Sequence, residues 1–133
     1  MWQRVSVIDQ FPPILCFRVN RFLFDKTTYS ITKNTTLVTL EDVIQVPNCE
    51  NAMIEYTMRM IVCLMCRTIT QHYRLRAACL HKGNRADFGH YVAIYREEGM
   101  EGWVLCNDSH VVVTAKPPIE ECYLVFYERV DEE

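Results

Sequence analysis

The residues of this sequence best suited to chemistry are a histidine beside a glycine and an amide beside a carboxylate. Gly89, His90 and Tyr91 follow a glycine-containing loop, and Asn107 and Asp108 lie beyond the next turn. When an amide or carboxylate binds one imidazole nitrogen, it fixes the tautomer and orientation of the ring. The other nitrogen can then take a proton from a thiol or hydroxyl. The pattern suggests a general base with an orienting partner.

A two-stranded ribbon is expected to bring these groups together. Strands over residues 90–96 and 103–106 flank a turn over 97–102 that carries two glycines. A hairpin centred on that turn places position 90 opposite a position close to 108, so we expect His90 beside Asn107 and Asp108. On spacing alone, an ordinary hairpin with polar ends and a hydrogen-bonded surface histidine is the more frequent explanation.

The remaining pattern predicts an α+β fold that is mainly antiparallel β-sheet with one or two short helices. In the first half we expect a proline-led strand within 11–24, a connecting turn over 25–34, a β-branched run over 35–40 and a helix over 50–70. In the second half we expect strands at 73–80, 111–113 and 123–130 and a one-turn helix at 117–121. The strand over 73–80 should place Tyr73, Leu75, Ala77 and Cys79 on one face. We expect residues 1–133 to form a single domain.

Composition excludes several classes of protein. Half of the 133 residues are hydrophobic, which favours a packed core over disorder, and the net charge of −3 provides no basic field for nucleic acid. The apolar run over 60–66 is too short and too closely flanked by charge to cross a membrane, and the N-terminus lacks a signal-peptide pattern. We expect no nucleic-acid or membrane partner.

Seven cysteines, an odd number, mostly lie inside apolar runs. We interpret them as reduced thiols of a cytoplasmic or nuclear protein. Cys16, Cys79, Cys106 and Cys122 are expected to pack as small hydrophobic side chains. Cys63 and Cys66 have the spacing of half a zinc site. Because core cysteines are the more frequent explanation, we predict no metal and no cofactor.

Several segments together resemble the ubiquitin-specific protease family, in the family's order and over residues 11–130. They are Phe11-Pro12-Pro13-Ile14-Leu15 with Arg21-Phe22, Lys33-Asn34 with Val38, Tyr73-Arg74-Leu75 through His81-Lys82-Gly83, Gly89-His90-Tyr91 through Arg96, Trp103 through Val111 with Asn107-Asp108-Ser109, and Tyr123-Leu124-Val125-Phe126-Tyr127. The sequence departs from the family pattern where Asn20 replaces lysine, where Phe-Pro-Glu is absent after Val38, and where Cys106 replaces an aromatic residue.

The resemblance implies that residues 1–133 form a single partial domain, the palm-like, C-terminal part of a papain-like cysteine protease domain. The family cleaves the bond after the last glycine of ubiquitin. It implies that His90 is the general base, that Asn107 orients it, and that Asp108 supports or replaces Asn107. Gly89 and Tyr91 would line the channel for the ubiquitin tail. The implied partners are ubiquitin, ubiquitinated proteins and the other half of the same domain.

The family's nucleophile belongs to a Gly-Asn-Thr-Cys-Tyr type box, and this sequence contains none. Two interpretations stay open. The chain is either the base-bearing part of a deubiquitinase, inactive alone, or an inactive relative that binds ubiquitin or another protein. Retention of Gly89, His90, Asn107 and Asp108 favours the first, because a binding module has no chemical need for them. Without the helical half of the domain, an apolar face would favour self-association.

Overall fold

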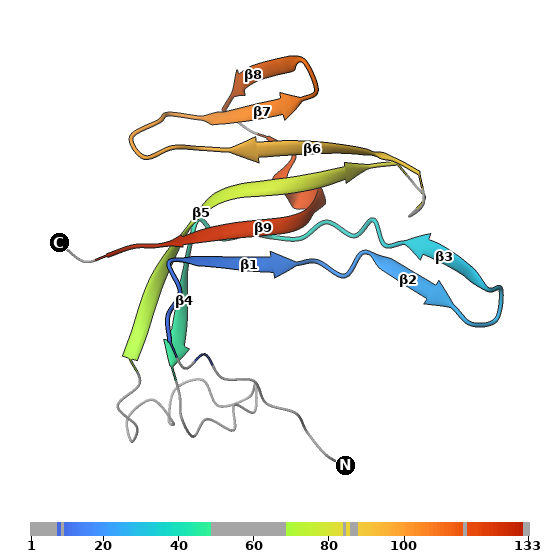
Figure 1. Ribbon diagram of the computed structural model, residues 1–133, viewed down its shortest axis with the longest axis horizontal. Helices are drawn as coiled ribbons and strands as arrows, with labels where there is room; N and C mark the ends of the chain where they lie inside the picture. The colour runs from blue at the N-terminus through green and yellow to red at the C-terminus, as the bar shows by residue number, and fades with distance from the viewer. Residues whose placement is uncertain are drawn as a thin grey trace, which may run out of the picture.

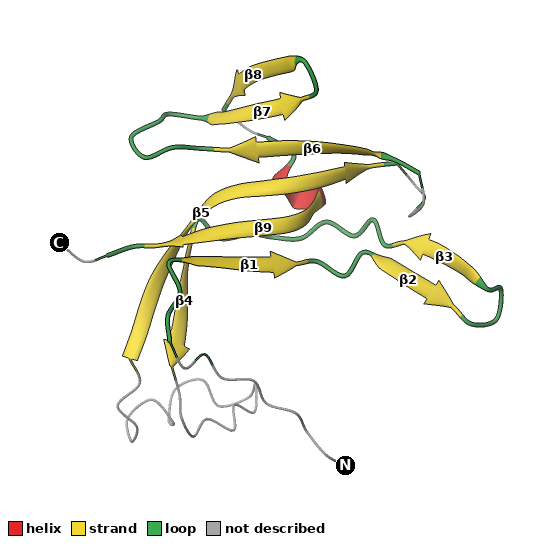
Figure 2. Cartoon of the chain, in the orientation of Figure 1, coloured by secondary structure: helices red, strands yellow, loops and turns green. Residues whose placement is uncertain are grey.

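The computed structural model describes residues 8, 10–48, 69–83, 85, 88–115 and 117–131. The elements in these residues are β1 (Ile14–Arg18), β2 (Phe22–Asp25), β3 (Ser30–Lys33), β4 (Val43–Asn48), β5 (Ile69–Lys82), β6 (His90–Tyr95), β7 (Trp103–Asn107), β8 (His110–Thr114), a 3-10 helix at Ile119–Glu121 and β9 (Cys122–Arg129). The prediction of a mainly antiparallel sheet is confirmed (Figure 2). The short helix after the paired prolines is also present.

Seven strands form one antiparallel sheet in the order β1-β9-β5-β6-β7-β8, with β4 also paired to β5. The long strand β5 crosses the sheet, pairing with β4 near its start and with β6 near its end (Figure 1). The hairpin β2–β3 forms a separate two-stranded sheet that extends away from the larger one. The strands β6, β7 and β8 follow one another along the chain, so the predicted ribbon is built from neighbouring residues.

A β-bulge in β5 decides which of its residues are buried. Tyr73 and Leu75 face the core, but the pairing with β9 shifts register between Leu75 and Ala77. A shift of one residue moves all later side chains to the other face. Ala78 and Leu80 are therefore fully buried, and the prediction that Ala77 and Cys79 share the face of Tyr73 is wrong.

The core lies on one face of the sheet, where β5, β6 and β9 meet. Its buried side chains include Tyr73, Leu80, Ile94, Val125 and Tyr127. Partly buried apolar residues from the proline segment, the 34–42 connection, β4 and the 3-10 helix pack against them; these include Phe11, Leu15, Leu40, Ile44 and Ile119. Fully burying each large side chain contributes roughly 1.5–3 kcal/mol, so this face stabilises the fold.

The first 48 residues differ most from the sequence-based expectation. The single strand expected within 11–24 is divided, because residues 19–21 separate β1 from β2. The expected turn over 25–34 contains β3. Residues 35–40 form no strand, because the Arg21 side chain binds the carbonyl of Thr36 and Val38 N donates to Glu120 O. The strand β4 was not predicted.

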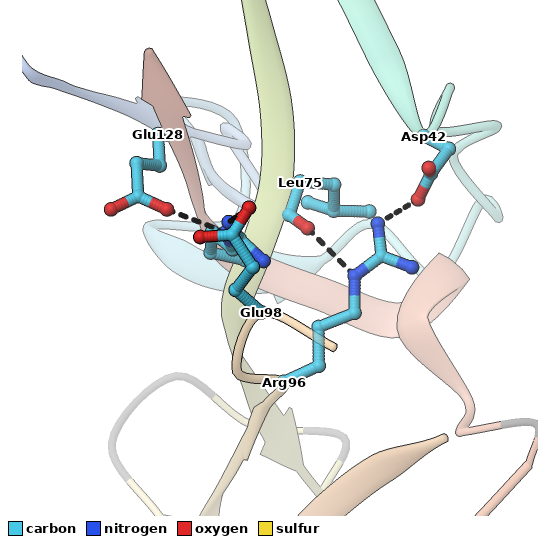
Figure 3. Close-up of polar contacts among 6 residues, drawn as sticks. Asp42, Leu75, Arg96, Glu98 and Glu128 are labelled. Atoms are coloured by element: carbon cyan, nitrogen blue, oxygen red, sulfur yellow. Dashed lines mark hydrogen bonds and ion pairs between the residues drawn. The ribbon is translucent and has the colours of Figure 1, made fainter. Parts of the chain in front are cut away.

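Two arginines link neighbouring strands of the sheet (Figure 3). Arg96 donates from Nε to Leu75 O at 3.0 Å and forms an ion pair with Asp42. Its guanidinium also stacks 4.7 Å from the centre of the Trp103 ring. Arg76 Nε donates to Glu128 Oε2 at 2.5 Å. The Arg96 contacts fix the end of β6 opposite the end that carries His90, and the Arg76 contact links β5 to β9.

The expected helix over 50–70 lies mostly outside the described residues, and its last two positions belong to β5. Cys49, Cys63, Cys66 and the apolar run over 60–66 also lie outside them. Within the described part of the chain, no helix has the length and apolar character needed to span a membrane.

Candidate active site

The pairing of β6 with β7 determines where His90 lies. Ala93 pairs with Cys106 and Tyr95 with Val104. Continuing this register by one pair places Asn107 opposite Val92. His90 is two residues from Val92, and alternate residues of a strand share a face. His90 and Asn107 are therefore diagonal neighbours on one face of the ribbon, within reach of each other.

The side chains of His90 and Asn107 are in direct contact. His90 Nε2 lies 2.5 Å from Asn107 Oδ1. An amide oxygen can only accept, so Nε2–H donates and the lone pair of Nδ1 is left to accept a proton. The His90 side chain is 43% exposed, which leaves the ring accessible. The arrangement is that of an oriented base.

Asp108 stands next to this pair without joining it. Its Oδ2 lies 3.8 Å from His90 Nε2, beyond hydrogen-bond distance, and its side chain is 79% exposed. Asp108 begins the two-residue turn between β7 and β8 with φ +52°, a conformation that aspartate tolerates better than most residues. The structure thus makes Asn107 the direct partner of His90 and leaves Asp108 at the periphery.

Gly89 is confined by the neighbouring strand. A Cβ at this position would lie 2.1 Å from His81 Nε2 and 2.7 Å from Lys82 O. Such distances are not tolerated, so packing alone requires glycine here. The expectation that Gly89 also admits a substrate backbone concerns its other side and stays a prediction.

The second histidine, His81, is packed as part of the structure. Its side chain is 2% exposed, and its ring meets those of Phe22 and Tyr91 at centroid distances of 5.3 and 4.9 Å. Burial lowers the pKa of His81, and the nearby ammonium of Lys33 lowers it further. Tyr91 lies on the opposite face of β6 from His90 and is 57% exposed, so it contacts His81 and not His90.

Two basic residues that sequence reasoning left without a role support this region. Lys33 Nζ donates to the carbonyls of His81 and Gly83, at the start of the loop leading to Gly89. Arg21, buried beside it, donates to four backbone carbonyls. The sequence did contain a signal for Arg21, because a charged residue between apolar Val19 and Phe22 requires a specific set of partners.

The described cysteines are distributed over the sheet. Cys122 is buried, Cys79 and Cys106 are half-buried, and Cys16 is exposed, which corrects the expectation that Cys16 is a buried side chain. Cys106 directly precedes Asn107, so its side chain points to the other face of β7. The described residues include no group of three or more His, Cys, Asp or Glu side chains that could hold a metal ion.

Comparisons with known proteins agree on one family. The family of ubiquitin carboxyl-terminal hydrolases matches residues 4–127. Ubiquitin carboxyl-terminal hydrolase 10 of Mus musculus is 30% identical over 139 residues, which cover 96% of this chain and 16% of the mouse protein. Ubiquitin carboxyl-terminal hydrolase 5 of Homo sapiens is 41% identical over 58 residues, which cover 44% of this chain and 6% of the human protein. The chain thus spans about a sixth of the length of the first of these relatives.

Solved structures agree on the fold. The structure of the SAGA Ubp8/Sgf11/Sus1/Sgf73 DUB module bound to ubiquitin aldehyde has a TM-score of 0.69 at 21% identity, covering 92% of this chain and 25% of the matched chain. A structure of the yeast SAGA DUB module gives 0.67 at 22% identity, covering 92% and 26%. The profile match, which extends over nearly the whole chain, places this protein in the ubiquitin carboxyl-terminal hydrolase family.

Proposed function

We propose that this chain supplies the general base and the orienting amide of a cysteine-type deubiquitinase. The observation that carries the proposal is the 2.5 Å contact between His90 Nε2 and Asn107 Oδ1, in a protein of this family. A segment outside these 133 residues would supply the cysteine. Ubiquitin conjugates would be the substrate, in the cytoplasm or the nucleus.

In this proposal His90 first accepts a proton and later donates it. Nδ1 takes the proton of the cysteine thiol, and the resulting thiolate attacks the carbonyl carbon of the last ubiquitin glycine. The imidazolium then gives that proton to the leaving amine as the carbon–nitrogen bond breaks. Water completes the cycle by hydrolysing the thioester. Asn107 holds Nε2–H throughout, so the ring keeps Nδ1 directed at the reacting atoms.

The substrate channel would follow the residues on either side of His90. Gly89 and Tyr91 flank His90 on the chain, and the tail of ubiquitin would pass along them. Gly89 is exposed on the side away from His81, and the Tyr91 ring is largely exposed, which supports a role in contact with another chain. Asp108 would affect the reaction only indirectly, through its influence on His90.

A ubiquitin probe with a thiol-reactive C-terminus tests the proposal. We expect no covalent product with the 133-residue chain alone, because none of its cysteines lies in a nucleophile box. A longer protein that joins this chain to the cysteine segment should react and should hydrolyse ubiquitin conjugates.

In that longer protein, His90→Ala should lower turnover by about 10²–10⁴-fold, the usual contribution of a general base. His110→Ala, which alters an exposed histidine of β8, is the matched control. Unchanged turnover after His90→Ala would overturn the role of His90. Labelling of the chain alone, lost on changing one of its cysteines, would overturn the location of the nucleophile.

The alternative of an inactive binding module gives a different result in the same experiment. Such a module would bind ubiquitin while the longer protein showed no hydrolysis. The His90–Asn107 contact favours the enzyme, because a binding surface gains nothing from an imidazole whose tautomer is fixed.

A further inference from the structure

A pocket of about 440 Å³ opens beside the start of the loop that leads to His90. Its lining includes three basic side chains, one carboxylate and the ring of His81; the charged residues are Arg21, Lys33, Lys82 and Glu121. Three positive charges against one negative charge leave a formal excess of two. The pocket is therefore a local concentration of positive charge on a chain whose net charge is −3.

The positive charge of Arg21 lies inside the protein. Its side chain is 3% exposed, and the guanidinium donates to the carbonyls of Cys122, Asn34, Thr36 and Glu120 at 2.5–3.1 Å. Carbonyl groups satisfy N–H donors but carry no formal charge. Among the described residues Arg21 forms no ion pair with a carboxylate. Buried charges in proteins are normally paired, but within the described residues the charge of Arg21 is left without a counter-ion.

Lys33 adds a second cation on the same side of the pocket. Its ammonium also donates to carbonyls, those of His81 and Gly83, and forms no ion pair within the described ranges. Burial lowers the pKa of Lys33, and the positive charge of Arg21 lowers it further, so the two cations lie close enough to repel each other. Glu121 opposes this effect only in part.

His81 provides an independent indication of a ligand. Its Nδ1 is buried and has no hydrogen-bond partner in the part of the chain that the structure describes. Unsatisfied polar atoms in protein interiors are rare and cost about 1–3 kcal/mol. The pocket lining thus contains both the buried charge of Arg21 and a histidine with an unsatisfied nitrogen.

We propose that this pocket binds an oxyanion, either a phosphate or a carboxylate group. Guanidinium and ammonium groups are the side chains that recognise such oxygens, and an excess of two charges suits a dianion. The bound group would neutralise the repulsion between Arg21 and Lys33. Because Lys33 also holds the carbonyls of His81 and Gly83, an anion in the pocket would tighten the start of the loop that ends at Gly89. This proposal does not depend on the hydrolase activity.

Titration of the isotope-labelled chain with inorganic phosphate tests the site by nuclear magnetic resonance. The amides of Thr35 and Gly83, both in the lining, should shift with a saturating dependence. Sodium chloride at equal ionic strength should not reproduce the shifts. Acetate at equal ionic strength identifies the source of the anion: phosphate binding at least tenfold tighter indicates a phosphorylated ligand, and similar affinities indicate a carboxylate.

Exposed side chains of the lining give variants that leave the fold intact. Lys82→Met should weaken phosphate binding at least fivefold, and Glu121→Gln should tighten it at least threefold, because it removes a repelling charge. Lys26→Met removes the same charge from the exposed β2–β3 turn and should leave binding unchanged. Shifts that follow ionic strength alone, or equal weakening by Lys26→Met and Lys82→Met, would overturn the proposal. An unaltered affinity in Glu121→Gln would do the same.

Discussion

His81 and His90 have the same side chain in two opposite environments, although Lys82, next to His81, pairs directly with His90. His81 is packed against two aromatic rings, and its Nδ1 reaches no described partner. His90 is accessible, and Asn107 holds one of its nitrogens. Proton transfer requires an accessible nitrogen and a fixed ring, and His90 alone of the two has both. The difference shows that the role of a histidine depends on its neighbours more than on its position in a motif.

Gly89 connects the two regions. It lies against the ring of His81 and directly precedes His90, so the buried ring limits where the β6 strand begins. In the proposed function the exposed region carries the chemistry, and the buried region holds it in place. Variants of the two histidines and of their neighbours separate these two contributions.

Replacing each histidine by alanine should separate stability from chemistry. His81→Ala should lower the free energy of unfolding by roughly 2–4 kcal/mol, because it empties a buried site. His90→Ala should change it by no more than about 0.5 kcal/mol, since the ring is accessible. Denaturant unfolding of the two variants measures both values. Equal losses would show that the two environments differ less than the structure indicates.

Asn107→Ala should weaken the reaction without removing the base. A hydrogen bond to a charged group contributes about 1.5–3 kcal/mol, which corresponds to a decrease of about 10- to 100-fold in the turnover of the longer protein. Asp108→Ala is the matched control and should cost less, because Asp108 lies beyond hydrogen-bond distance of His90. A larger loss for Asp108→Ala in the same kinetic assay would reverse their roles.

Gly89→Ala should destabilise the chain by about 1–3 kcal/mol through overpacking against His81. Gly99→Ala is a useful control, because its added Cβ meets no atom while its φ of +75° still disfavours alanine. Its cost therefore reports backbone strain without a clash. A double-mutant cycle between Gly89→Ala and His81→Ala should show partial relief, since the Lys82 carbonyl remains close. Strictly additive losses would argue against the contact.

The smallest effect is a dependence of stability on pH. The pKa of His81 is lowered in the folded state from its ordinary value of 6.5, so the unfolded chain binds more protons as the pH falls below 6.5. Folding stability should decline over that range and be fully present above it. His81→Phe keeps a ring but cannot titrate, and should flatten the decline between pH 7 and pH 5.5 in thermal unfolding. An equally steep decline in the variant would exclude His81 as its source.

The ribbon could be predicted from the sequence because its strands are neighbours along the chain. The strand β6 alternates between buried and exposed residues, and a short glycine-containing connection separates it from β7. The face of β5 could not be predicted beyond Leu75, because the bulge depends on pairing with β9, some fifty residues later. The roles of Arg21 and Lys33 could not be predicted either. The backbone carbonyls that accept their hydrogen bonds come close to them only in the tertiary fold.

The sheet order has a consequence for the way the chain is made. β9, which follows all the other described strands along the chain, lies between β1 and β5 and joins the two. Until its residues emerge from the ribosome, β1 lacks the only pairing partner that it has among the described strands, while the β6–β7–β8 meander can already close on itself. Nascent chains that end before Cys122 should therefore expose unpaired backbone along β1 and β5, which makes them candidates for chaperone binding and for aggregation.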